Sequence, residues 1–373
     1  MTIEHARISQ RGEFQALLCE HMARLFPGSR VVEVVPLGPD TGTTAGIAKA
    51  AGYGLPVRVV LVESNGRRRQ VVWHTASSNE LGHDRRADRV AGMVSSFDEF
   101  AQIPRHARAL DVGFVARDGS SLISVRDGDE AYLISEFVPG SIYADDLRGI
   151  AARGSLRELD RARVDALVAY LAALHVPIRN GEIAYRRAIR DLVGHGEGVF
   201  GMVDAYPDST PSAGRGRLQA IEERCATWRH RLRGTHERLT RTHGDFHPFN
   251  IVFGDGVGFS LLDASRGACG DPADDLTALA VNFLLFSVGR DGAWQAGLGE
   301  LWHRWWSGYA AARRDDALLE VVPPFFAWRT LVVCNPGFYP DLSPDARDRM
   351  LGFAERVLEE GRLDPAWADE VLR

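Results

Sequence analysis

The segment 242–263, THGDFHPFNIVFGDGVGFSLLD, holds the side chains best suited to chemistry. It contains a carboxylate, a carboxamide and a second carboxylate in that order, Asp245, Asn250 and Asp263. In metal-assisted phosphoryl transfer, one Asp orients or deprotonates a hydroxyl, while an Asn and a second Asp hold Mg²⁺ against nucleotide phosphates. Catalysis of this kind depends on positioning and charge neutralisation, so a few oxygen groups on a rigid loop suffice. We therefore predict a magnesium-dependent phosphoryl-transfer site here.

Two histidines in the same segment allow another interpretation. His243, Asp245 and His247 form an HxDxH pattern, which can bind zinc in a metal-dependent hydrolase. No distant Cys/His cluster supports such a site, and the chain has no GxSxG motif that would supply a nucleophile elbow. We expect both histidines to make hydrogen bonds within the loop, and the hydrolase remains the less favoured alternative.

The composition is that of a globular chain. Of its 373 residues, 45% are apolar and 25% are charged, which are ordinary values. The net charge of -6 argues against bulk nucleic-acid binding, and no apolar run approaches the roughly 20 residues that span a bilayer. The N-terminal residues lack the pattern of a secretory signal. The cysteines, Cys19, Cys225, Cys269 and Cys334, show no CxxC spacing, so we expect reduced thiols and a cytoplasmic protein without membrane or nucleic-acid partners.

The first part of the chain has mainly strand signals. Asn65-Gly66 is a hairpin signal between two β-rich stretches, and a helical pattern precedes them. We predict a small sheet with one inserted helix before Val138-Pro139-Gly140 breaks the pattern. The predicted strands are 31–37, 56–62, 69–75, 122–125 and 131–137, and the predicted helices are 13–25 and 84–100.

Helical periodicity dominates the rest of the chain. Two clear helical patterns cover 161–175 and 218–232, and everything after Pro272 is expected to be helical. Two apolar stretches, 276–288 and 321–333, are interrupted by polar or bulky residues and indicate buried helices. Two short strands, 250–253 and 259–262, flank Asp255-Gly256 within the chemistry-bearing segment. We therefore predict an α+β fold with domains 1–137 and 138–373.

A small β-rich lobe followed by a larger helical lobe with an HxDxxxxN loop is the arrangement of protein-kinase-like folds. The chain resembles the aminoglycoside phosphotransferase and choline kinase superfamily. Its segment 243–250, HGDFHPFN, is similar to the catalytic loop of that family, and Asp263 matches the second metal-binding Asp. The stretch 270–276, GDPADDL, resembles the family's GDPxxDL segment.

The resemblance implies a role for each matching residue. Asp245 would be the catalytic base, and Asn250 and Asp263 would bind Mg²⁺. Glu136 and Phe137 would lie at the hinge between the lobes, where main-chain groups meet the base of ATP (or GTP). The acceptor would be a hydroxyl on a small molecule. A protein substrate is not expected, because Asp263 runs quickly into the GDPxxDL segment without an activation loop.

The chain departs from the family at the phosphate-binding lysine. Family members usually carry this lysine on the third strand, where this chain has His74, and Lys49 is the only lysine of the chain. A neutral imidazole is a weaker phosphate ligand than an ammonium group. Lys49 follows a Gly/Thr-rich loop at 38–46, and we expect Lys49, His74 and the loop residues Gly42 and Thr43 to contact the nucleotide.

The departure leaves a second function open. The main expectation is a small-molecule kinase, and the alternative is a catalytically impaired nucleotide-binding pseudoenzyme. Beyond the loop, Asp271 before Pro272 is expected to cap the next helix, and Asp274 and Asp275 should favour its positive end. Arg266 is expected to neutralise phosphate charge or to pair with Asp271 or Asp274.

Overall fold

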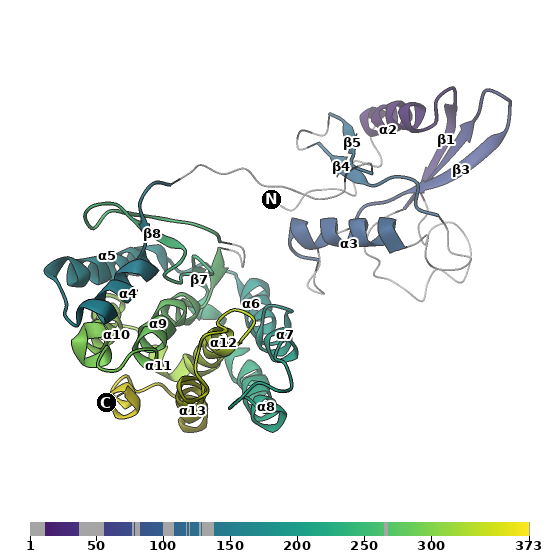
Figure 1. The fold of residues 1–373 in the computed structure, drawn as a ribbon. Helices are drawn as coiled ribbons and strands as arrows, with labels where there is room; N and C mark the ends of the chain where they lie inside the picture. The colour runs from purple at the N-terminus through teal and green to yellow at the C-terminus, as the bar shows by residue number, and fades with distance from the viewer. Residues whose placement is uncertain are drawn as a thin grey trace. The chain divides into compact units, whose positions relative to one another are not determined.

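The computed structural model describes residues 12–36, 56–76, 78, 83–99, 108–116, 118, 120–126, 128, 138–264 and 268–372. The chain divides into two compact units, Met1–Ser135 and Glu136–Arg373 (Figure 1). The described residues of the first form short strands and two helices, and those of the second are mainly helical, as expected for an α+β kinase-like fold. Each unit is described by itself.

The first unit is built on a three-stranded antiparallel sheet in the order β1-β2-β3. Helix α2 (Gly12–Leu25) packs along β1 (Arg30–Pro36), and the β2 (Val57–Val62) to β3 (Arg68–Trp73) hairpin turns at Gly66, whose φ of 82° favours glycine. Helix α3 (Arg86–Glu99) and the hairpin of β4 (Gly113–Val115) and β5 (Leu122–Ser124) complete it. Its small core consists of Phe14, Leu18, Met22, Val57, Val59, Leu61 and Leu122. The predicted strand 131–137 lies outside the described residues.

The second unit confirms the predicted change to helical structure. Its α-helices are α4 (Tyr143–Arg153), α5 (Glu158–Leu174), α6 (Glu182–Gly194), α7 (Val199–Asp204), α8 (Arg215–Leu232), α9 (Pro272–Val288), α10 (Gly299–Arg313), α11 (Leu318–Val321), α12 (Pro323–Cys334), α13 (Pro344–Glu360) and α14 (Trp367–Leu372). The short helices η3 (His236–Arg238) and η4 (Trp294–Leu298) connect some of them.

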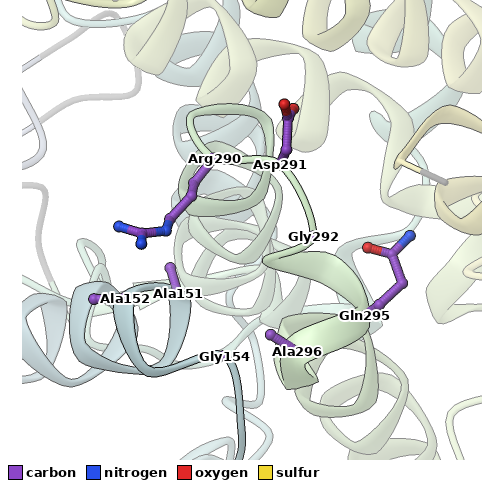
Figure 2. Close-up of a pocket in the computed structure, with 8 residues that line it drawn as sticks. All are labelled: Ala151, Ala152, Gly154, Arg290, Asp291, Gly292, Gln295 and Ala296. Carbon is purple, nitrogen blue, oxygen red and sulfur yellow. The ribbon is translucent and has the colours of Figure 1, made fainter.

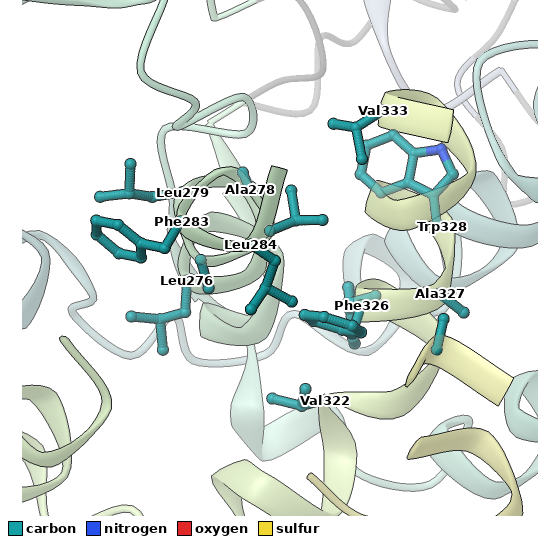
Figure 3. Close-up of a cluster of buried hydrophobic side chains, with 14 of the residues drawn as sticks. Leu276, Ala278, Leu279, Phe283, Leu284, Val322, Phe326, Ala327, Trp328 and Val333 are labelled. Atoms are coloured by element: carbon teal, nitrogen blue, oxygen red, sulfur yellow. The ribbon is translucent and has the colours of Figure 1, made fainter. Parts of the chain in front are cut away.

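Helices α9 and α12 form the middle of the helical core. Both are buried around nearly their whole circumference, because their sequences are apolar on every face. Figure 3 shows Leu284 of α9 close to Phe326 of α12 within this cluster. The prediction of two buried helices is confirmed. One charged residue of α12, Arg329, is also buried, with only 5% of its surface exposed, so a guanidinium group lies inside this apolar layer.

Two small sheets fix the ends of the chemistry-bearing loop. Strand β7 (Thr240–Arg241) pairs with β10 (Cys269–Gly270), and β8 (Ile251–Phe253) pairs with β6 (Ser141–Ile142) and β9 (Phe259–Leu261). The loop 242–250 therefore begins on one sheet and ends on another. Because both ends are hydrogen-bonded, its polar side chains are carried on a rigid frame.

Candidate active site

The start of the loop is held by a carboxylate from α9. Asp275 accepts hydrogen bonds from the main-chain N–H groups of His243, at 2.7 Å, and Gly244, at 2.8 Å. Gly244 has φ of 85°, where a side chain would be strained. Asp275 also lies 3.2 Å from Nε2 of His175, whose Nδ1 is 2.6 Å from the hydroxyl of Tyr309. This network is fully buried, so it fixes the loop to the helical core.

Asp245 lies in this loop between a guanidinium group and an imidazole. Its Oδ1 accepts a hydrogen bond from Nη1 of Arg329 at 2.6 Å, and its Oδ2 is 3.4 Å from Nε2 of His247. Burial alone raises the pKa of the Asp245 carboxyl, but the interaction with His247 and the charge of Arg329 hold that pKa well below its usual range. Asp245 is therefore ionised at neutral pH, as a group that orients a hydroxyl must be.

Asn250 brings the predicted site residues together. Its Nδ2 donates to the main-chain oxygen of Asp245 at 3.1 Å and approaches that of Asp263 at 3.5 Å. The amide oxygen of Asn250 therefore points away from these two carbonyls. Asp263 is exposed and has φ of 39°. A carboxamide oxygen and an exposed carboxylate are the hard oxygen ligands that Mg²⁺ prefers, so this pair fits that ion.

The start of α9 confirms the predicted cap. Asp271 accepts a hydrogen bond from the main-chain N–H group of Ala273 at 3.0 Å, and Pro272 occupies the first helical turn. Asp271 also receives two hydrogen bonds from Arg238, at 2.8 and 3.0 Å, and one from the hydroxyl of Tyr185. This buried carboxylate is thus paired within the helical unit.

The other acidic residues of α9 do more than was predicted. Asp274 receives a hydrogen bond from Nη2 of Arg329 at 2.7 Å, and Asp275 binds the loop. Proximity to the positive end of the helix explains neither contact, since both involve specific side chains or amides from other segments. Arg266, the expected partner, lies outside the described residues.

The predicted nucleotide-binding residues lie mostly outside the described residues. This holds for Lys49, Gly42, Thr43, Glu136 and Phe137. His74 is described: it follows the last residue of β3, Trp73, and its side chain is exposed. Its contact with a nucleotide stays a prediction.

The structure does not assemble the zinc site of the alternative hydrolase. Nδ1 of His243 lies 3.3 Å from the main-chain nitrogen of Asp245, and Nδ1 of His247 lies 3.2 Å from that of Phe249, so each imidazole is engaged with the loop backbone. Within the parts of the chain that the structure describes, no group of three His, Cys, Asp or Glu side chains could hold a metal ion.

Arg329 is the site residue that the sequence prediction missed. The one signal for it in the sequence is a charged residue in the apolar run 321–333, and a charge there indicates only an interruption of a buried helix. Nothing in the spacing of Asp245 and Arg329, 84 positions apart, indicates that they form an ion pair.

The helical unit also has a pocket of about 440 Å³ away from the loop. Figure 2 shows the side chains of Arg290 and Gln295 beside it, and small residues of α4 form another part of its wall. It is lined by Ala151, Ala152, Gly154, Arg290, Asp291, Gly292, Gln295 and Ala296. None of the residues around Asp245 is among them, so we assign this pocket no part in the reaction.

The chain matches a known protein family. The model of the phosphotransferase enzyme family matches residues 83–314, more than half of the chain. No curated protein shows a significant match. Similar solved structures include a glucosamine kinase (crystal form A), with 16% identity, coverage of 96% of this chain and 100% of that chain, and a TM-score of 0.43. Choline kinase LicA from Streptococcus pneumoniae has 11% identity, coverage of 93% and 99%, and a TM-score of 0.36.

Proposed function

Because the chain belongs to the phosphotransferase enzyme family, we propose that it transfers the γ-phosphoryl group of ATP (or GTP) to a hydroxyl of a small molecule, with Mg²⁺ as cofactor. Membership of the family confirms the predicted resemblance and the enzyme class. The nucleotide, the metal ion and the class of acceptor are parts of the proposal.

The observation that carries the proposal is the link made by Asn250. One amide nitrogen faces the main-chain oxygens of both Asp245 and Asp263, so Asn250 joins the loop before the β8–β9 hairpin to the segment after it. This link supports the proposal that the Asp245 carboxylate acts on the hydroxyl while Asn250 and Asp263 supply oxygen ligands for the metal ion. Phosphoryl transfer needs this set, because its catalysis is mostly positioning and charge stabilisation.

Asp245 would act on the acceptor. Its ionised carboxylate accepts a hydrogen bond from the acceptor hydroxyl and aligns the oxygen with the γ-phosphorus. A bond forms between that oxygen and phosphorus, the bond from phosphorus to the β–γ bridging oxygen breaks, and the nucleoside diphosphate leaves. The hydroxyl proton passes to Asp245 as the new bond forms.

Asn250 and Asp263 would hold the metal ion. When bound, Mg²⁺ would neutralise charge on the phosphate oxygens. The hydrogen bond from Nδ2 of Asn250 to the main-chain oxygen of Asp245 restrains its amide plane, and Nδ2 lies 3.5 Å from the main-chain oxygen of Asp263, two residues after β9. The backbone that carries both proposed ligands would therefore be in place before the nucleotide binds.

A cytoplasmic location is part of the proposal. Cys19, Cys225, Cys269 and Cys334 are free thiols, as expected where ATP is abundant and thiols are kept reduced. None of the helices in the described ranges is long and apolar enough to cross a membrane.

Calorimetry of ATP and GTP binding, with and without Mg²⁺, tests the proposal on the native protein and on Asp263→Asn. We expect magnesium-dependent binding that is weakened in Asp263→Asn. Asp255→Asn is the matched control, since Asp255 is an exposed carboxylate in the same β8–β9 hairpin, and it should bind as the native protein does. Failure of the folded native protein to bind either nucleotide would refute the proposal.

A panel of hydroxyl-bearing sugars, amino alcohols and aminoglycosides then tests turnover. Phosphorylation of a panel member that is lost in Asp245→Asn would support the kinase. Magnesium-dependent binding with no turnover on any of them would instead favour the nucleotide-binding pseudoenzyme.

A further inference from the structure

Arg329 occupies a position that is costly for stability. Its side chain is 6% exposed within helix α12, and its Nε is buried with no hydrogen-bond partner among the described residues. Burying a charge costs free energy unless it is well paired, and a well-packed apolar side chain often replaces a buried ion pair without loss. Stability alone therefore does not account for an arginine at this position.

The contacts of Arg329 point to Asp245 instead. Nη1 donates to Oδ1 of Asp245 at 2.6 Å, and Nη2 donates to Oδ1 of Asp274 at 2.7 Å. Cζ of the guanidinium group lies 3.9 Å from the ring centre of Trp328, whose Nε1 donates to the main-chain oxygen of Glu197 at 2.9 Å. Asp274 and the ring of Trp328 thus hold the guanidinium group of Arg329 in place while its Nη1 binds Asp245.

One oxygen of Asp245 is occupied by this contact. With Oδ1 bound to Arg329, the carboxylate cannot rotate without breaking a short charge-assisted hydrogen bond. Oδ2 lies on the side of His247 and Asn250, at 3.4 Å from a nitrogen of each. The orientation of the carboxylate decides which oxygen meets an acceptor hydroxyl.

We infer that Arg329 is a positioning residue for the proposed reaction, which holds Oδ1 of Asp245 so that Oδ2 receives the acceptor hydroxyl. Asp274 serves this arrangement by holding the other arm of the guanidinium fork. This inference rests on the proposed function and goes beyond it, because it assigns a role to a residue of α12 outside the catalytic loop.

The chemistry requires arginine at this position. Its planar fork reaches two carboxylates at once, whereas lysine offers one nitrogen on a flexible stem. Lysine would keep the positive charge but could not hold Asp245 and Asp274 in the same fixed geometry. Arg329→Lys therefore separates the effect of charge from that of orientation.

The test follows release of inorganic phosphate from MgATP, with water as the acceptor, in native protein, Arg329→Lys and Arg329→Met. We expect a roughly 100-fold lower rate in Arg329→Met, the size of effect that a small misplacement of a catalytic group produces. Arg329→Lys should recover part of the rate. MgATP affinity by calorimetry should stay within about twofold of native, because the loss is in the rate of the reaction and not in binding.

Arg347 supplies the matched control. It is another buried arginine, 3% exposed, and it donates to the main-chain oxygens of Cys334, Leu342 and Pro211 without touching the loop. Arg347→Lys should lower thermal stability as Arg329→Lys does, but leave the rate of the folded protein unchanged.

Two results would overturn the inference while leaving the proposed function intact. One is a native rate in folded Arg329→Met together with loss of activity in Asp245→Asn. The other is an equal loss of rate in Arg329→Lys and Arg347→Lys, which would make both arginines purely structural. Absence of ATP and GTP binding by the folded native protein would refute the proposed function, and the inference would be overturned with it.

Discussion

His175 and Asp275 lie 3.2 Å apart, Nε2 to Oδ2, and neither side chain is exposed to solvent. Asp275 uses both of its oxygens on the main-chain N–H groups of His243 and Gly244, directly before Asp245. The packing of the helical core and the geometry of the proposed active site are therefore linked through one buried carboxylate.

Replacing Asp275 by Asn is expected to weaken this link. The amide keeps the size of the side chain but has a single acceptor oxygen, so one main-chain N–H group in the loop loses its buried partner. Such a loss costs roughly 1–3 kcal/mol. Urea unfolding at neutral pH measures it, with the exposed Asp255→Asn as a control that should change little. Equal stability of Asp275→Asn and native protein would mean that the loop does not depend on this carboxylate.

Asp245→Asn is expected to abolish transfer while preserving MgATP binding. The amide cannot accept the hydroxyl proton, and loss of a general base lowers rates by about 10²–10⁴-fold. Its shape still allows a contact with Arg329, so the fold should persist. Transfer to the best acceptor and calorimetry of MgATP test the two parts. A variant that retains its rate would exclude Asp245 as the base.

The stability of the protein should depend on the ionisation of Asp245 in acid. Because its folded pKa is lowered, this group contributes stability that is present above its unfolded pKa of about 3.9 and is lost as pH falls through the folded pKa. Relative to Asp245→Asn, the native protein should thus lose more stability between pH 5 and pH 3. Urea unfolding at stepwise pH values measures both slopes, and parallel slopes would contradict the expectation.

Two substitutions at Asn250 should separate its two roles. Asn250→Asp keeps an oxygen ligand for Mg²⁺ but loses the N–H groups that face the main-chain oxygens of Asp245 and Asp263. Asn250→Ala loses both functions. We expect magnesium-dependent ATP binding to persist in Asn250→Asp and to weaken in Asn250→Ala, with low turnover in both. Equal nucleotide affinity in both variants would argue against Asn250 as a metal ligand.

Loss of the Asp271 side chain is expected to lower the free energy of unfolding more than loss of an ordinary helix cap does. Asp271→Ala removes the cap of α9 and leaves the guanidinium of Arg238 without its bidentate partner in a buried site. Breaking a buried ion pair costs roughly 3–5 kcal/mol. Ser343→Ala is the control, because Oγ of Ser343 caps α13 by accepting one hydrogen bond from the N–H group of Ala346, and its loss should cost about 1 kcal/mol. Similar losses in the two variants would contradict this view.

Local patterns were enough to predict several of the described elements. The Asn65-Gly66 turn, the cap at Asp271 and the buried helices α9 and α12 follow from interactions between near neighbours or from apolar periodicity. The order of Asp245, Asn250 and Asp263 was also readable, because all three lie on one short loop and hairpin whose geometry local hydrogen bonds define.

Phosphoryl transfer could be predicted from the sequence, since residue types and short spacings decide which ligands and bases one loop can present. The side chains that surround the loop, such as Arg329 and Asp275, could be found only in the folded structure. Arg329 meets Asp245 across 84 positions because α12 packs against α9, whose Asp275 holds the loop. His175 meets Asp275 across 100 positions because α10 packs against both α5 and α9. Such contacts depend on the packing of whole helices, which no local pattern of residues specifies.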